Sequence, residues 1–403
     1  MPGIGTAGAE PRPPVPCAGG RRACGRIPSR STAAPDRSAR AVPGTTREVY
    51  VSTLQAEHVY KVFGNRPDDA VRALEGGGDR SELRADGATA AVIDVSFDVE
   101  PGQIFVVMGL SGSGKSTLLR MLNGLLEPTA GRILFDGQDL TALSARELRR
   151  VRSTKISMVF QHFALFPHRN VLENAGYGLE VQGVPRADRD RRAAEALALC
   201  GLEGWEMAWP DELSGGMQQR VGLARALATD AELLLMDESF SALDPLIRRD
   251  MQDQLLELQR TLKKTIVFIT HDLNEAMRLG DGIAVMRDGR VVQQGTAEDI
   301  LTRPADDYVA SFVQDVDRSR VLTADAVMTT TRPHRPGADS CGCPTVTADT
   351  PLADLCAVSA RVPHPVTVTG TDGSVVGSVP QDRLVAFIGD EQRAPVRCAE
   401  VAA

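Results

Sequence analysis

Short apolar runs alternate with segments of helical periodicity through the middle of the chain. Each run suits one buried strand, and the runs lie at residues 103–108, 156–160, 232–238 and 265–270. Strands without a polar face are typical of parallel sheets that helices cover on both sides. Apolar residues at helical spacing follow these runs, at residues 118–126, 188–200, 221–228 and 247–262. The pattern predicts an α/β domain with a largely parallel sheet.

Other segments predict an antiparallel edge to this domain. They are an edge strand at 54–63, an alternating strand at 92–99, and a strand at 131–138 that closes in a turn. Asp288 and Gly289 mark a hairpin turn near the end of the domain. Residues 64–90 are rich in Gly, Asp and Arg, and we expect them to form an insertion that is partly helical around residues 68–74.

A helical subdomain is expected within the α/β core, at about residues 165–225. Its evidence is the helical periodicity over residues 188–200 and again beyond Leu202. A charged helix at 144–151 precedes it. At the start of the subdomain, residues 161–168 place three large apolar side chains in a loop that contains proline. Such side chains are either packed into the core or form a docking surface.

Composition changes sharply after the first 50 residues. Residues 1–50 are rich in Pro, Ala, Gly, Arg and Ser, and we interpret them as a disordered tail or as sequence upstream of the true start. They carry a net charge of +5, whereas residues 51–403 carry −13. An acidic body argues against a nucleic-acid partner. No apolar run approaches the roughly 20 residues that span a bilayer, so a role at a membrane requires another chain.

The seven cysteines are scattered, which fits a reducing compartment better than a disulfide framework. Cys341 and Cys343 lie near His334 but lack a second pair at zinc-finger spacing. We interpret them as loop cysteines.

A phosphate-binding pattern, G-x-x-x-x-G-K-[ST], follows directly on the run at 103–108. It is spelled by Gly109, Leu110, Ser111, Gly112, Ser113, Gly114, Lys115 and Ser116. Its glycines let backbone N–H groups turn toward phosphate oxygens, Lys115 supplies a positive charge, and the Ser116 hydroxyl can bind Mg²⁺. The helix that follows favours anions at its N-terminus. Strand, glycine loop and helix in this order predict a nucleotide site.

Further candidate residues stand at strand ends and at a helix start. Asp237 and Glu238 end a buried strand, where the first acid can hold Mg²⁺ through water and the second can orient an attacking water. His271 ends the next strand and is either structural or catalytic. Residues 213–220 begin a helix, and Ser214 there is either a simple N-cap or part of a second phosphate-binding helix start.

Aromatic residues make up only 4% of the chain, so few rings are candidates for stacking on a nucleotide base. Tyr60 and Phe63 are two of them. Either ring could instead belong to the core, and the sequence leaves this choice open.

Together these motifs resemble the ATP-binding subunit of ABC transporters over roughly residues 51–315. They occur in the family's order and spacing, with the Walker A loop at 109–116, the Q-loop residue Gln161, the signature at 213–218, the Walker B strand at 233–238, the D-loop at 241–244 and the switch histidine His271. The resemblance implies an ABC-type P-loop NTPase fold with an antiparallel β edge and a helical subdomain. It implies ATP hydrolysis with Mg²⁺.

The resemblance also implies individual roles. Two copies would sandwich two ATP molecules, with the phosphate loop of one facing the signature of the other. Ser116, Gln161 and, through water, Asp237 would hold Mg²⁺. Glu238 would be the general base, with His271 and Gln161 beside it. The implied ATP-binding residues are Gly109, Ser111, Gly112, Ser113, Gly114, Lys115, Ser116, Thr117 and Phe63 from one copy, and Ser214, Gly215, Gly216 and Gln218 from the other.

Residues 108–111, 160–168 and 312–319 narrow the resemblance to the subunits that energise glycine betaine and proline uptake, and the insertion at 64–90 also resembles that group. The implied partners are a second copy, an integral-membrane permease docked on the loop at 161–168, and, indirectly, an extracytoplasmic substrate-binding protein. The chain would act at the cytoplasmic face of the membrane. The alternatives are an importer of another solute, such as an amino acid, and a soluble ABC ATPase. Soluble ABC ATPases usually carry long coiled coils or two cassettes, and this sequence has neither.

Residues 320–389 resemble a CBS region, a small regulatory βαββα module, and residues 390–403 read as a tail. Asp372 and Gly373 supply its hairpin turn. A second full motif is missing, and Pro380 stands where the family often has a Thr or Ser that contacts nucleotide. These departures argue against nucleotide sensing and against a reading in which ligand sensing is the main function. Subunit pairing and a response to ionic strength stay open.

Overall fold

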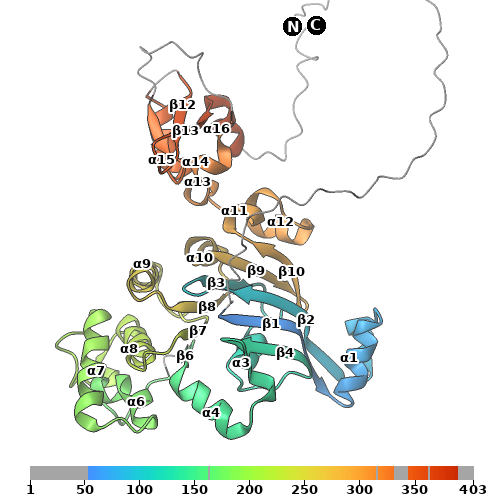
Figure 1. Ribbon diagram of the computed structural model, residues 1–403, viewed down its shortest axis with the longest axis vertical. Coiled ribbons are helices and arrows are strands. Elements are labelled where there is room, and N and C mark those ends of the chain that lie inside the picture. The colour runs from blue at the N-terminus through green and yellow to red at the C-terminus, as the bar shows by residue number, and fades with distance from the viewer. Residues whose placement is uncertain (1–52, 162–163, 315, 331–343, 362–363, 389–403) are drawn as a thin grey trace, which may run out of the picture. The chain divides into compact units, whose positions relative to one another are not determined.

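The computed structural model describes residues 53–161, 164–314, 316–330, 344–361 and 364–388. A six-stranded sheet in the order β10, β9, β3, β8, β7, β6 lies at the centre of the α/β part (Figure 1). Its neighbouring strands pair parallel, except β10 with β9. The bounds are β3 (Ile104–Met108), β6 (Ile156–Val159), β7 (Leu233–Asp237), β8 (Thr265–Thr270), β9 (Gly282–Arg287) and β10 (Arg290–Gly295). This sheet confirms the predicted fold class.

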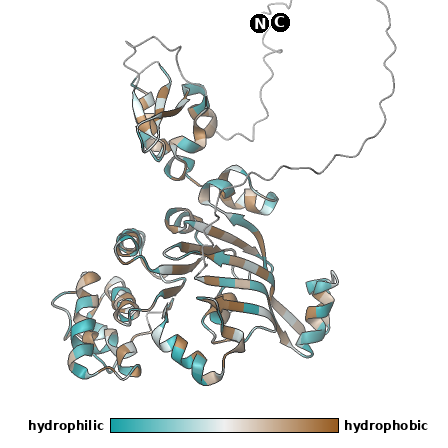
Figure 2. Ribbon diagram, in the orientation of Figure 1, coloured by the Kyte–Doolittle hydropathy of each residue, from teal (hydrophilic) through white to brown (hydrophobic). Residues whose placement is uncertain are grey.

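The central strands are buried on both faces. Every residue of β3 and β8 is buried, and Figure 2 shows hydrophobic colour along the middle of the sheet. This is the burial that continuous apolar runs predict for parallel strands. Because parallel strands end at the same edge of a sheet, the segments after β3, β7 and β8 meet there.

A four-stranded antiparallel sheet in the order β2, β1, β4, β5 forms the second layer. Its strands are β1 (Leu54–Gly64), β2 (Ala88–Val99), β4 (Ala130–Phe135) and β5 (Gln138–Asp139). The prediction that residues 54–63 form an edge strand was wrong, because β1 pairs with both β2 and β4. Register shifts after Ala56 and Glu57 interrupt the pairing there, and the polar pair Glu57 and His58 at that irregularity imitates an exposed edge.

The stretch between β1 and β2 contains α1 (Pro67–Glu75) and α2 (Arg80–Ala85). The helix expected around residues 68–74 is therefore present, and β2 begins slightly before the expected end of the insertion. Val71, Leu74 and Leu83 pack with Tyr60 in a small apolar cluster of their own. Tyr60 is thus a core residue and is not available to stack on a base.

The phosphate-loop helix and the charged helix flank the sheets. They are α3 (Lys115–Leu122) and, after the 3-10 turn η1 (Leu140–Ala142), α4 (Ala145–Thr154). Ser144 and Glu147 cap the N-terminus of α4 with a reciprocal capping box. Figure 2 shows this helix as hydrophilic over most of its length.

The helical subdomain consists of α5 (Val171–Ala175), α6 (Tyr177–Val181), α7 (Arg186–Leu199), the 3-10 turn η2 (Pro210–Glu212) and α8 (Gly215–Ala228). Figure 1 shows α7 and α8 side by side, and Arg192 on α7 donates to the last carbonyl of α8. The prediction of a further helix directly beyond Leu202 was wrong, because only the 3-10 turn η2 forms between α7 and α8. Gly204, with a φ of 89°, and Pro210 interrupt the apolar spacing there.

The helices that follow the helical subdomain, up to residue 330, are α9 (Pro245–Leu262), α10 (Leu273–Leu279), α11 (Ala297–Thr302), α12 (Asp307–Val313), α13 (Arg318–Val321) and α14 (Ala324–Val327). The C-terminal elements are β11 (Thr345–Thr347), α15 (Leu352–Ser359), β12 (Val366–Thr369), β13 (Val375–Val379) and α16 (Gln381–Ile388). Their order is the expected βαββα, while membership of the CBS family stays a prediction. Residues 1–50 and 390–403, Cys341, Cys343 and His334 lie outside the described residues. Within the described ranges, no helix is both long and apolar enough to cross a bilayer.

Candidate active site

The phosphate loop joins β3 to α3 in a tightly packed turn. The Lys115 side chain is only 4% exposed, and its Nζ donates to the carbonyl oxygens of Gly109 at 2.8 Å and Leu110 at 3.1 Å. Burial lowers the pKa of Lys115, although Glu238 and Asp237 oppose that effect. The lysine is therefore held at the loop by backbone carbonyls.

Two positions of the loop leave no room for a side chain, so only glycine fits there. A Cβ at Gly109 would lie 2.3 Å from the Met286 carbonyl oxygen, and one at Gly114 would lie 2.2 Å from the Ala91 carbonyl oxygen. Both residues also have positive φ, of 150° and 101°. The pattern in the sequence therefore reflects close backbone approach as well as a turn.

The two acids after β7 take different positions. Asp237 Oδ1 accepts a hydrogen bond of 3.1 Å from Ser116 Oγ, which places a hydroxyl and a carboxylate together at the start of α3. Burial raises the pKa of Asp237, and the Ser116 hydrogen bond opposes this shift. Glu238 has a positive φ of 42°, so its side chain leaves the strand in a direction that a regular strand residue would not take.

Three candidate residues from separate loops converge on Glu238. Its Oε2 atom lies 3.1 Å from Nδ1 of His271 and 3.4 Å from Nε2 of Gln161. Its Oε1 atom lies 3.9 Å from Lys115 Nζ. The Glu238 side chain is 19% exposed and that of His271 54% exposed, so the carboxylate is sheltered while the imidazole faces solvent.

Ser241 was expected only as the first residue of the D-loop, yet it holds two catalytic candidates in place. Its Oγ donates to the Glu238 carbonyl at 2.8 Å and accepts from Gln161 Nε2 at 3.3 Å. A hydroxyl three residues after the second acid was a usable signal, because a turn brings such residues together.

The signature residues are placed apart from this cluster. Ser214 caps α8 by accepting from the Met217 N–H, and Gln218 Nε2 donates to the carbonyl oxygens of Pro210 and Leu213. Among the described residues, no hydrogen bond or ion pair joins Ser214, Gly215, Gly216 or Gln218 to the phosphate loop. One copy of the chain does not bring the two motifs together.

Of the two aromatic candidates, Phe63 remains. Its residue is 43% exposed at the end of β1, and Lys61 Nζ lies 5.4 Å from its ring centroid. Stacking of Phe63 on a base stays a prediction.

The apolar loop after β6 is partly covered. Leu165 packs against the core, and the half-buried Phe166 ring lies 4.6 Å from that of Tyr177. Phe163 lies outside the described residues. Both described apolar side chains of the loop, Leu165 and Phe166, are thus half-buried, and the choice between core packing and a docking surface stays open.

The residues present fit a magnesium nucleotide. The Ser113 hydroxyl is buried in the loop and has no hydrogen-bond partner among the described residues. A buried polar group without a partner is costly, so a phosphate oxygen at the loop would satisfy it. Ser116 and Asp237 supply the oxygen ligands that Mg²⁺ prefers. Thr117 is half-buried one residue further along α3, and Ser111 is exposed on the loop.

The fold and this site define a P-loop ATPase. The family model described as ABC transporter matches residues 92–241. The chain is 59% identical over 276 residues to a glycine betaine transport ATP-binding protein of Bacillus subtilis, covering 68% of this chain and 66% of the relative. It is 56% identical over 279 residues to a glycine betaine/carnitine transport ATP-binding protein of Listeria monocytogenes, covering 69% of this chain and 70% of the relative. The chain spans about two thirds of the length of these relatives.

A third relative covers more of both chains. It is a trimethylamine N-oxide transport system ATP-binding protein of Pelagibacter ubique, 42% identical over 84% of this chain and 98% of its own length. The chain belongs to the family of ABC transporter ATP-binding proteins, and it is an ABC-type ATPase that binds ATP. The family predicted from the sequence is confirmed.

Solved structures agree. The dimeric structure of the ABC transporter cassette MJ0796 matches with a TM-score of 0.52 and 31% identity, over 60% of this chain and 98% of that chain. The cbiO1 protein of Clostridium perfringens matches with a TM-score of 0.53 and 27% identity, over 63% of this chain and 92% of that chain.

Proposed function

We propose that this ATPase energises the import of osmoprotectants of the glycine betaine and proline type through a partner permease. The observation that carries the proposal is the identity of 59% to a glycine betaine transport ATP-binding protein over 68% of this chain. Relatives named for glycine betaine/proline betaine transport share 53–54% identity over 67% of this chain, which supports the same substrate class. An importer of a different solute is the runner-up.

At the site, Lys115 and the backbone N–H groups from Gly112 to Thr117 hold the phosphates. Ser116, Gln161 and, through water, Asp237 would hold Mg²⁺, which would neutralise charge on the phosphoryl group that is transferred. Glu238 accepts the proton of the attacking water, because its sheltered carboxylate contacts both His271 and Gln161. His271 orients this carboxylate and would lie at the γ-phosphate.

The functional unit is a pair of these subunits on a membrane permease. Ser214, Gly215, Gly216 and Gln218 of one copy complete the site of the other. The absence of any hydrogen bond or ion pair between them and the phosphate loop, within the described residues of one copy, supports this. The loop at 161–168 receives a cytoplasmic helix of the permease. An extracytoplasmic binding protein delivers the solute on the other side, so the chain acts at the cytoplasmic face of the membrane.

Uptake of radiolabelled glycine betaine, with and without osmotic upshift, tests the proposal. Cells carry the native operon with the wild-type chain, the Lys115→Ala variant, or the control Arg260→Ala, which removes an exposed cation far from the loop in sequence. We expect background uptake for Lys115→Ala alone. Unchanged uptake in that variant, with no redundant importer present, would show that the substrate class is wrong. Competition by unlabelled proline, carnitine and trimethylamine N-oxide then ranks the substrates.

A further inference from the structure

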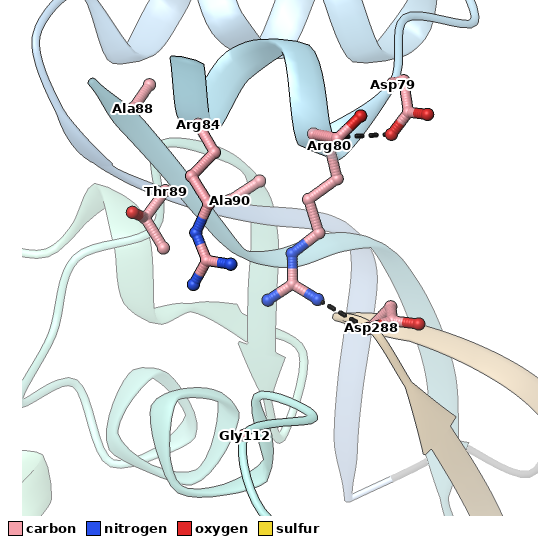
Figure 3. A pocket seen from close by; sticks show the side chains of 9 residues that line it. Asp79, Arg80, Arg84, Ala88, Thr89, Ala90, Gly112 and Asp288 are labelled. Atoms are coloured by element: carbon pink, nitrogen blue, oxygen red, sulfur yellow. Dashed lines mark hydrogen bonds and ion pairs between the residues drawn. The ribbon is translucent and has the colours of Figure 1, made fainter. Parts of the chain in front are cut away.

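A cavity of about 540 Å³ lies beside the phosphate loop, on the side of the insertion. Its wall combines α2, the first residues of β2, Gly112 of the loop and Asp288 of the β9–β10 turn. Figure 3 shows Arg80 and Arg84 projecting from α2 into this space, toward the turn that carries Gly112. The insertion, which the nucleotide motifs do not include, therefore contributes two cations to the surroundings of the nucleotide loop.

The two arginines differ in their partners. Arg80 donates to Asp288 Oδ1 at 3.0 Å. The Arg84 guanidinium has no hydrogen-bond or ion-pair partner within the described part of the chain. Its five N–H donors are therefore available to a ligand in the cavity.

The Arg80 ion pair also links α2 to the phosphate loop. Asp288 is followed by Gly289, whose N–H donates to the Ser113 carbonyl at 3.1 Å and whose carbonyl accepts from Ile93 N–H at 2.8 Å. Through this turn Arg80 holds the start of α2 against the loop. The position of Arg84 over the cavity thus depends on the Arg80–Asp288 contact.

The loop is open toward this cavity. A Cβ built at Gly112 meets no atom within 4 Å, so nothing in the described chain covers that face of the loop. Lys115 is the cation of the loop itself, and its Nζ lies 3.9 Å from Glu238 Oε1. Arg287, beside the cavity, is held by Asp288, with its Nε 3.6 Å from Oδ2. A bound triphosphate carries more negative charge than one such lysine balances, and arginine recognises phosphate through paired N–H donors.

We propose that Arg84 binds the phosphate chain of the nucleotide across the cavity from Lys115, and that Arg80 positions it through Asp288. The insertion is then part of the nucleotide site. This inference rests on nucleotide binding by the phosphate loop, and it concerns residues that the nucleotide motifs leave out.

The test measures dissociation constants for ATP and for inorganic tripolyphosphate, a phosphate chain without a base, on the full chain. Arg84→Ala should weaken both about tenfold, the size expected for a charged hydrogen bond near the surface, and Arg84→Lys should restore part of the loss. The matched control is Arg72→Ala, because Arg72 lies on α1 of the same insertion and pairs with Asp69 away from the cavity.

Two outcomes would overturn the proposal. ATP affinity within twofold of wild type in Arg84→Ala removes Arg84 from the site. Weaker ATP binding with unchanged tripolyphosphate binding assigns Arg84 to the base or ribose and refutes the phosphate contact. In either case the nucleotide site itself is tested separately. If the wild-type chain binds ATP and Lys115→Ala does not, the assignment of the phosphate loop stands.

The positioning role of Arg80 has its own readout. Arg80→Ala and Asp288→Ala should each raise the KM for ATP by a similar factor with kcat unchanged, and the double variant should be no worse than either. Arg80→Lys should recover part of the affinity. Additive losses, or a fall in kcat equal to the rise in KM, would refute positioning through this pair.

Discussion

The Oε2 atom of Glu238 lies 3.1 Å from Nδ1 of His271, although 33 residues separate them in sequence. The contact forms because β7 and β8 are parallel neighbours whose carboxyl ends meet. The positive φ of Glu238, 42°, turns its side chain toward this edge. The unusual backbone conformation therefore serves the placement of one carboxylate.

Replacement of that carboxylate tests its role as the base. Glu238→Gln keeps the shape of the side chain but cannot accept a proton, so we expect kcat for ATP hydrolysis to fall about 10² to 10⁴-fold. ATP affinity should stay within a few fold of wild type. Phosphate release and equilibrium nucleotide binding measure the two quantities.

The matched control for this variant is Glu232→Gln, the same change at an exposed acid before β7, whose side chain pairs with Lys155 at 3.6 Å. It should leave turnover unchanged. Turnover above half the wild-type value in Glu238→Gln would remove Glu238 from the role.

Two alanine substitutions in the phosphate loop distinguish the cost of a strained backbone from the cost of a steric clash. Gly112→Ala introduces backbone strain alone, because residue 112 has a φ of 80° and a Cβ there would contact no atom within 4 Å. Gly114→Ala has a φ of 101° and also places a Cβ 2.2 Å from the Ala91 carbonyl oxygen. Strain of about 1 kcal/mol lowers the melting temperature by roughly 2–4 °C in a domain of this size.

We therefore expect Gly114→Ala to lower the melting temperature clearly more than Gly112→Ala does. We also expect Gly114→Ala to abolish ATP binding. Equal shifts in the two variants would mean that the loop relaxes around the new Cβ.

Glu275 makes stability depend on pH. Its side chain is 4% exposed and its carboxylate accepts from Thr270 Oγ at 2.6 Å and Gln252 Nε2 at 3.3 Å. Burial is the main cause that raises its pKa above the ordinary 4.5; Asp272 adds to the shift and Arg248 opposes it. A raised folded-state pKa means that this contribution to stability is complete below the unfolded pKa and is lost as pH rises through the folded pKa.

Glu275→Gln removes this titration while keeping the hydrogen-bonding shape. We expect the melting temperature of the variant minus that of wild type to increase as pH rises from about 4 through the raised pKa of Glu275. Differential scanning calorimetry at several pH values measures the difference. A difference that is constant over this range, or that shrinks as pH rises, would contradict the assignment.

Contiguous residues were enough to predict the phosphate loop, the buried strands and the acids at the end of β7. Each depends on a local property: glycines that permit a turn, continuous apolar runs, and charged side chains at a strand end. The family followed from the order of these motifs, since order and spacing are read directly along the chain.

Only the tertiary structure decided which neighbour covers each segment. Apolar periodicity indicates that a residue is buried but not which element covers it. The sequence alone therefore predicts an edge strand at residues 54–63 and leaves Tyr60 as a possible base-stacking ring. The same limit applies to Arg84 and Gly112, which belong to different elements and line one cavity only after β1, β2 and the insertion have folded. The chemical groups of each motif lie close together in the sequence and can be recognised there. The residues that surround the site are brought to it by long-range packing.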